Sequence, residues 1–155
     1  WNSICAWGPT ALLPIFQQLG TDDKKKIISA HLLKEDSRFD TFTKISFIYP
    51  HAVASMKVGQ GVKSEGELVI SGTKGYIYVP APWWKTDYFE VRYENSAENK
   101  RYFYQLDGEG IRYELLSFIK SILSGSSFSY VDSETSNAIS RIISDFYNRV
   151  DTVII

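Results

Sequence analysis

The chain has 155 residues, of which 44% are apolar and 15% aromatic, a size and composition typical of one globular domain with its own core. Lysine and arginine number 17 and aspartate and glutamate 18, so the formal net charge is −1. Such an even balance argues against nucleic acid as a partner, because binding to a phosphate backbone requires a basic surface.

The cysteine count and the hydropathy of the chain indicate its cellular compartment. Cys5 is the only cysteine, which excludes a disulfide within the chain and favours a reducing compartment, so we expect the cytoplasm. No apolar run approaches the roughly 20 residues that span a bilayer, and no membrane partner is expected. The chain begins at Trp1 without a methionine, and we interpret residues 1–155 as a single domain excised from a longer protein.

The first half of the chain predicts one helix and three strands. A short amphipathic helix ending at Gly20 is indicated by apolar residues at helical spacing, namely Leu12, Leu13, Ile15, Phe16 and Leu19. Alternating and β-branched sequence then predicts strands over 27–33, 39–49 and 52–58.

The second half predicts two strand pairs and two helices. Strands at 68–70 and 76–79 flank a glycine-bounded hairpin turn, and strands at 88–93 and 101–106 flank a polar turn. Apolar spacing predicts a core-facing helix over 111–122. A last helix is expected to begin at a cap, Asp132 or Ser133, and to carry an apolar stripe as far as Val150.

These elements together predict an α+β fold. We expect a broad, mostly antiparallel sheet of about seven strands with helices packed on one face. Because many strand residues are aromatic, the other face is expected to remain open for contacts with another domain or subunit.

Two groups of residues invite a functional interpretation that their context does not favour. Gly59-Gln60-Gly61 begins like a dinucleotide fingerprint, but the following residues predict a strand, so a plain turn is expected. His31 and His51 have no cysteine or carboxylate at ligand spacing, which predicts packing or surface positions and no metal site. Cys5 is interpreted as a buried residue without a catalytic role.

Trp83-Trp84-Lys85, framed by two prolines, is the most distinctive local sequence. One tryptophan could stack on a sugar while the other enters the core, or both could belong to the core or an interface, which large aromatic residues often dominate. Four acidic residues near strand ends could form an acid–base pair, but solvated positions are the simpler interpretation for all of them: Glu65, Glu67, Asp87 and Glu90.

Residues 67–84, with the hairpin Ile70-Ser71-Gly72-Thr73-Lys74-Gly75, and the later Tyr113-Glu114 to Phe118 segment resemble the C-terminal domain of the Gfo/Idh/MocA oxidoreductases. The resemblance extends over nearly the whole chain in the order of elements. It implies a domain that forms the floor of a substrate pocket beside an N-terminal Rossmann domain, and often makes subunit contacts through its open sheet.

The resemblance also implies what this chain does not contain. The Rossmann domain that would bind NAD or NADP, and the Glu-Lys-Pro segment with the family's catalytic lysine, are absent from it. The family's Asp-x-Gly-x-His motif falls on residues 6–10, where Gly8 matches but Ala6 and Thr10 replace the acid and the histidine. Neither side chain is a general base near neutral pH, so no catalytic, cofactor-binding or metal-binding residue is assigned to this chain.

We therefore expect the substrate-binding and oligomerisation domain of an NAD(P)-dependent oxidoreductase acting on a sugar or polyol derivative, inactive by itself. The predicted substrate-binding residues are Asn2, Trp7, Thr10, Trp84 and Lys85, with the tryptophans stacking on a ring and the lysine pairing with an anionic group. The alternative is a non-enzymatic binding or dimerisation module that keeps the fold without dehydrogenase chemistry, which the Ala6 and Thr10 substitutions favour.

Overall fold

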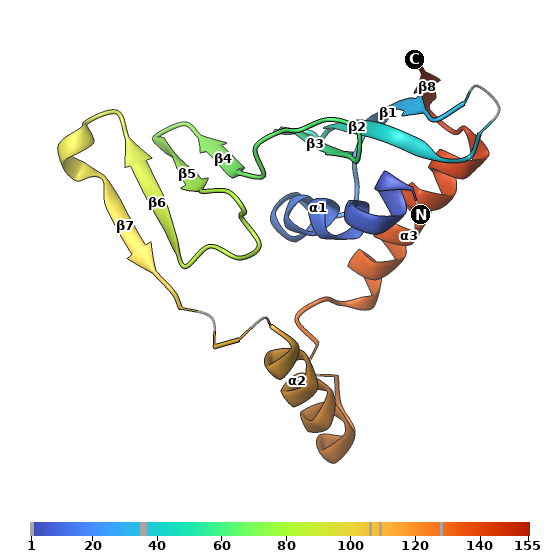
Figure 1. Cartoon of the computed structure of the whole chain (residues 1–155). Coiled ribbons are helices and arrows are strands. Elements are labelled where there is room, and N and C mark those ends of the chain that lie inside the picture. Colours follow the sequence, from blue (N-terminus) through green and yellow to red (C-terminus); the bar gives the residue numbers. More distant parts are fainter. Residues whose placement is uncertain (1, 35–36, 106, 109, 128) are drawn as a thin grey trace. The chain divides into compact units, whose positions relative to one another are not determined.

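The computed structural model describes residues 2–34, 37–105, 107–108, 110–127 and 129–155. The chain forms two compact units (Figure 1): the first combines Trp1–Lys63 with Tyr130–Ile155, and the second is Ser64–Ser129. Each unit is described by itself below.

The first unit is a four-stranded sheet with two helices on one face (Figure 1). Its elements are α1 (Ser3–Leu19), β1 (Lys25–Leu32), β2 (Asp40–Ile48), β3 (Val53–Gly59), α3 (Ser133–Asn148) and β8 (Thr152–Ile154). The strand order is β3-β2-β1-β8, antiparallel except that the short β8 runs parallel to β1.

The core of this unit follows from strand alternation and helical spacing. Inward-facing residues of β1 to β3 meet the buried faces of α1 and α3, in a cluster that includes Ile28, Ile45, Phe47, Leu12, Ile142 and Phe146. Outward-facing positions of the same strands, such as Lys44 and Lys57, are exposed. The period of two along each strand separates the two faces.

Helix α1 is longer than the sequence predicts. It begins at Ser3 and continues through Pro9 and Pro14, although each proline removes one backbone hydrogen bond from a helix. Packing outweighs this loss, because Ile4, Leu12 and Phe16 are all buried against the sheet.

The second unit is an antiparallel meander followed by one helix. Its elements are β4 (Leu68–Gly72), β5 (Gly75–Val79), β6 (Tyr88–Tyr93), η1 (Ser96–Glu98), β7 (Lys100–Phe103) and α2 (Ile111–Ser124), with the strands paired in chain order. The predicted hairpin is confirmed, with Gly72 paired to Gly75. Glycine is required at position 75, because a Cβ there would lie 2.4 Å from the carbonyl oxygen of Arg92.

The α+β class and the mostly antiparallel pairing are confirmed, but the single sheet of about seven strands is wrong. The described residues form eight strands in two sheets of four. Alternation locates strands without specifying which edges pair, and the three residues of β8 are too few for a periodic signal. The strand expected over 101–106 ends at Phe103, and position 106 lies outside the described residues.

The prediction of a core-facing helix over 111–122 is also wrong. Helix α2 forms at the expected place and ends at Gly125, but none of its residues is buried. Its apolar side chains are exposed, including Leu115, Phe118 and Ile122. The helix has the expected amphipathic spacing, but the described residues of its own unit do not cover its apolar face.

Candidate functional site

The first candidate site is the N-terminal half of α1, which carries three of the predicted substrate-binding residues. Asn2 is the N-cap: its Oδ1 accepts a hydrogen bond from the Cys5 backbone N–H at 3.1 Å. Its Nδ2 donates to the Tyr147 hydroxyl at 2.7 Å and to the Arg38 carbonyl at 3.3 Å. With only 2% of its surface exposed, Asn2 acts first as a structural cap.

A buried carboxylate from β2 meets the same end of the helix. Both oxygens of Asp40 accept from the Ile4 backbone N–H at 3.2 Å, and Oδ2 also accepts from the Thr43 hydroxyl at 2.6 Å. Ser3 Oγ donates to the Asp40 carbonyl at 3.2 Å. Asp40 is 3% exposed, so this network attaches the start of β2 to the first turn of α1.

Cys5 and Tyr147 lie side by side at the surface of this unit. The Sγ of Cys5 is 3.3 Å from the Tyr147 hydroxyl, and Cys5 is exposed, so the prediction of a buried cysteine is wrong. The hydrogen bond to Cys5 and partial burial raise the pKa of Tyr147, which leaves its hydroxyl protonated at neutral pH. With 3.6 residues per turn, the side of α1 that carries Cys5 differs from the side that packs on the sheet. Cys5 therefore contacts Tyr147 of α3 and not the sheet.

Trp7 and Thr10 lie one turn apart on the solvent side of α1. Trp7 is 51% exposed and Thr10 is also exposed, whereas Gly8 between them faces the core. A Cβ at Gly8 would lie 3.2 Å from Ile4 and 3.9 Å from Met56. The close packing of Gly8 therefore directs Trp7 and Thr10 outward, where both side chains are exposed.

The other two predicted residues, Trp84 and Lys85, belong to the second unit. The rings of Trp83 and Trp84 pack edge to face with centroids 6.1 Å apart, and Trp84 is 43% exposed. The Trp83 backbone N–H donates to the Gly66 carbonyl at 2.8 Å, and a Cβ at Gly66 would lie 3.1 Å from the Trp84 ring. The Trp84 ring therefore packs over Gly66 and against Trp83, and the rest of its surface is exposed.

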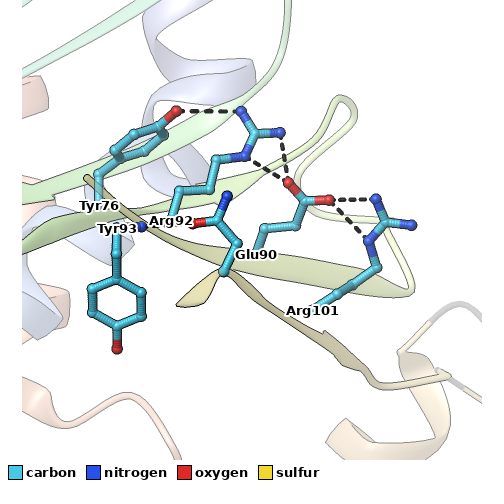
Figure 2. Close-up of polar contacts among 6 residues, drawn as sticks. Tyr76, Glu90, Arg92, Tyr93 and Arg101 are labelled. Atoms are coloured by element: carbon cyan, nitrogen blue, oxygen red, sulfur yellow. Dashed lines mark hydrogen bonds and ion pairs between the residues drawn. The ribbon is translucent and has the colours of Figure 1, made fainter. Parts of the chain in front are cut away.

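A network of arginine, glutamate and tyrosine side chains crosses one face of the β4–β7 sheet (Figure 2). Glu90 lies between two guanidinium groups, accepting from Arg92 Nε at 2.6 Å and from Arg101 at 2.8 and 2.5 Å. Arg92 also donates to the Tyr76 hydroxyl at 3.3 Å. These hydrogen bonds, first from Arg101 and then from Arg92, hold the pKa of Glu90 below its ordinary value.

Tyrosine rings complete this network. Arg92 lies 4.5 Å from the ring centroid of Tyr78, and Arg101 lies 4.7 Å from that of Tyr88. The prediction of a solvated strand edge is wrong for Glu90, whose side chain is only 13% exposed. The sequence could have indicated the Glu90–Arg92 contact, because the two residues are two positions apart in one strand and share a face. The contact with Arg101 depends on the pairing of β6 with β7, which places Arg101 opposite Glu90.

The remaining predictions about single residues concern surface positions. His31 and His51 are exposed, with His31 Nδ1 at 2.8 Å from the Thr41 hydroxyl, and Glu65, Glu67 and Asp87 are exposed as expected. Over the described ranges, no cluster of three or more metal-ligating side chains occurs. No helix in the part of the chain covered by the structure has the length and apolar content needed to cross a membrane.

The Gly59-Gln60-Gly61 segment does not form the turn that binds a nicotinamide dinucleotide. Gly59 ends β3, and Gln60 and Gly61 donate their backbone N–H groups to the Thr41 carbonyl. No helix follows, so these glycines offer no helix N-terminus to a pyrophosphate. The turn predicted from the sequence is confirmed.

No protein-family model and no curated protein matches this chain. Its fold matches solved oxidoreductase structures. KijD10, a 3-ketoreductase from Actinomadura kijaniata solved with NADP and TDP-benzene, is 9% identical with a TM-score of 0.76, over 99% of this chain and 47% of that chain. The protein yvaA from Bacillus subtilis, assigned as an oxidoreductase, is 12% identical with a TM-score of 0.70, over 97% of this chain and 50% of that chain.

A further protein from Klebsiella pneumoniae, also assigned as an oxidoreductase, is 13% identical with a TM-score of 0.63, over 97% of this chain and 47% of that chain. The chain therefore spans about half the length of the solved structures it matches. At these identities the likeness shows a shared fold.

Proposed function

We propose that this chain is the substrate-binding and oligomerisation domain of a Gfo/Idh/MocA-like, NAD(P)-dependent oxidoreductase that acts on a sugar or polyol derivative. In this proposal the domain binds and orients the substrate. The nicotinamide, which would supply or accept a hydride, is held by a Rossmann domain outside this chain.

One observation carries the proposal: nearly all of the chain aligns with about half of each oxidoreductase it matches. A fold shared over 99% of this chain and 47% of KijD10 is expected of one domain from a two-domain enzyme. Function is a property of the site and not of the fold, so the proposal also rests on which side chains are available to a ligand.

The exposed face of α1 has chemistry suited to a sugar. The Trp7 ring is open on the solvent side and can stack on the apolar face of a pyranose, while the Thr10 hydroxyl can both donate and accept hydrogen bonds. Asn2, held as the helix cap, contributes by fixing the first turn. We propose that Trp84 and Lys85 are also substrate-binding residues, with Lys85 pairing with an anionic group.

This face binds but does not transfer protons by itself. Ala6 has no polar side-chain atom, and a threonine hydroxyl such as that of Thr10 does not titrate near neutral pH. Proton transfer is therefore assigned, like hydride transfer, to groups outside this chain.

We further propose a homo-oligomer formed through an open sheet face of the second unit. Strand pairing puts apolar side chains on one face of β4–β7, where Ile70, Ile77 and Val91 form a row and Phe89 stacks on Tyr102 with centroids 5.0 Å apart. The opposite face carries the charged Glu90 network. Apart from Lys100, which pairs with Val91 on the same face, this surface is apolar and can meet a second copy of itself, as a twofold interface requires.

The second candidate function is a non-enzymatic binding or dimerisation module. It is favoured by Ala6 and Thr10, which stand where the family has its acid and histidine, and by the exposed apolar side of α2. In that case the fold is kept for assembly, and no substrate is turned over.

The test uses the complete protein that contains this chain. Binding of NAD(P)(H) is measured by fluorescence, and turnover of a panel of polyols and sugars is measured by the absorbance of the nicotinamide. We expect cofactor binding and turnover, with KM raised about tenfold or more in Trp7→Ala and unchanged in Trp83→Phe, which keeps an aromatic ring beside Trp84. A complete protein that binds no nicotinamide would discard the oxidoreductase and leave the binding module.

A further inference from the structure

The N-terminus of α1 is already occupied by groups of the protein. A helix begins with backbone N–H groups that have no partner within the helix, and these groups with the helix dipole attract anions such as phosphate. In α1 the N–H of Ile4 is bound by Asp40 and the N–H of Cys5 by Asn2. Two of the first-turn donors that could hold an anionic ligand are therefore used internally.

Asp40 also brings a negative charge to this end of the helix. Its two oxygens accept hydrogen bonds from the Ile4 N–H and the Thr43 hydroxyl. Because Asp40 is 3% exposed, water screens its charge less than it screens a surface carboxylate. Its charge offsets the partial positive charge of the helix N-terminus and leaves the first turn without an attraction for anions.

Trp7 and Thr10 lie close to this carboxylate along the helix. At a rise of 1.5 Å per residue, Trp7 is about 4.5 Å and Thr10 about 9 Å further along the axis than Ile4, whose N–H binds Asp40. The basic side chain at the C-cap of α3, Arg149, donates to the Ser37 carbonyl at 3.2 Å and lies over the Phe146 ring. It is engaged there and not with Asp40.

We propose that Asp40 is a specificity-determining residue: by closing the N-terminus of α1 with a buried charge, it makes the Trp7–Thr10 face accept the uncharged, hydroxyl-bearing part of a ligand and reject a phosphate. The inference rests on the proposed function for the contact between this face and a sugar. It adds that any anionic group of the substrate is bound elsewhere than at this helix.

The test compares neutral and phosphorylated probes on the complete protein. Affinities for myo-inositol and D-glucose, and for D-glucose 6-phosphate, are measured by calorimetry with the wild type, Asp40→Asn and a matched control, Asp132→Asn. The control removes the same charge at the N-cap of α3, where Asp132 accepts from the Thr135 N–H at 2.7 Å. We expect the wild type to prefer the neutral sugar by about tenfold or more, Asp40→Asn to lose most of that preference, and Asp132→Asn to keep it.

A second measurement separates this inference from the proposed function. Inorganic phosphate is titrated into ¹⁵N-labelled protein while the amide signals of Ile4 and Cys5 are followed. We expect no shift in the wild type and a saturable shift in Asp40→Asn, whether or not a sugar binds. Phosphate binding at these amides in the wild type, or equal affinity for glucose and its 6-phosphate, overturns the role of Asp40. If no sugar binds and phosphate does not shift these amide signals in the wild type, only the proposed function is overturned.

Discussion

The side chain of Asn2 donates a 2.7 Å hydrogen bond to the hydroxyl of Tyr147, which joins the cap of the first helix to the last turn of α3. The two residues are 145 positions apart. The same asparagine caps α1 through Cys5, so one buried amide fixes both the start of the helix and its packing partner.

Replacing Asn2 with alanine is expected to destabilise the first unit by about 1–2 kcal/mol, because it removes the helix cap and the hydrogen bonds to Tyr147 and Arg38. The free energy of unfolding in urea measures this. Asn137→Ala, at an exposed position of α3, is the control and should change stability by no more than about 0.5 kcal/mol. Equal effects of the two substitutions would contradict the structural role of Asn2.

Tyr49 is expected to make the stability of the fold fall at alkaline pH. Burial, with a further contribution from the Asp23 carboxylate, raises the pKa of Tyr49 to about 12, and its hydroxyl donates to the Gly20 carbonyl at 3.0 Å. Since the folded-state pKa lies above the unfolded value, Tyr49 stabilises the fold fully below about pH 10 and loses that contribution as pH rises towards 12. Unfolding in urea should show a fall of up to about 2 kcal/mol over this interval.

The matched variant for this prediction is Tyr49→Phe, which keeps the ring in the core and removes the ionisable group. It should be less stable than the wild type at pH 8 and lose less stability between pH 10 and 12. A wild-type profile no steeper than that of Tyr49→Phe would show that Tyr49 does not control the alkaline limit.

Glu90 is expected to hold β6 and β7 together in the absence of a buried core in their sheet. Glu90→Gln removes the charge that both Arg92 and Arg101 contact, and amide hydrogen exchange in β5 to β7 should become faster. Glu94→Gln, in the exposed turn after β6, serves as the control. Unchanged protection in Glu90→Gln would mean that the aromatic contacts alone hold these strands.

The same carboxylate predicts an acid-sensitive sheet. Because the two arginines depress the folded-state pKa of Glu90, its stabilising contribution is present above the unfolded value of about 4.3 and is lost as pH falls through the lower folded-state value. Protection factors in β5 to β7, which are corrected for the pH dependence of intrinsic exchange, should therefore fall below about pH 4 in the wild type and depend less on pH in Glu90→Gln.

The proposed oligomer can be tested on the apolar face of the β4–β7 sheet. Tyr102 is 44% exposed and stacks on Phe89, so Tyr102→Glu would place a charge within the proposed interface and convert the assembly to monomers in sedimentation velocity. Thr73→Glu, in the hairpin turn beyond the face, should leave the assembly intact. An oligomer that survives Tyr102→Glu uses another surface.

Local sequence signals located most of the elements of the fold. The hairpin at Gly72 and Gly75, the cap at Asp132 and the stop at Gly125 were all predicted, because each depends on the conformational preferences of a few adjacent residues. The strands were found for a similar reason, since alternation along one segment reports its two faces.

Tertiary structure decided which of these segments meet. The division into two sheets, the contact of Asp40 with the first turn of α1 and the Asn2–Tyr147 pair depend on partners 36 or more residues away. The exposure of α2 is of the same kind, since amphipathic spacing shows that a helix has an apolar face without showing what covers it. Composition, periodicity and caps are local properties of a chain; the environment of a buried carboxylate or of an open tryptophan exists only after distant segments have packed.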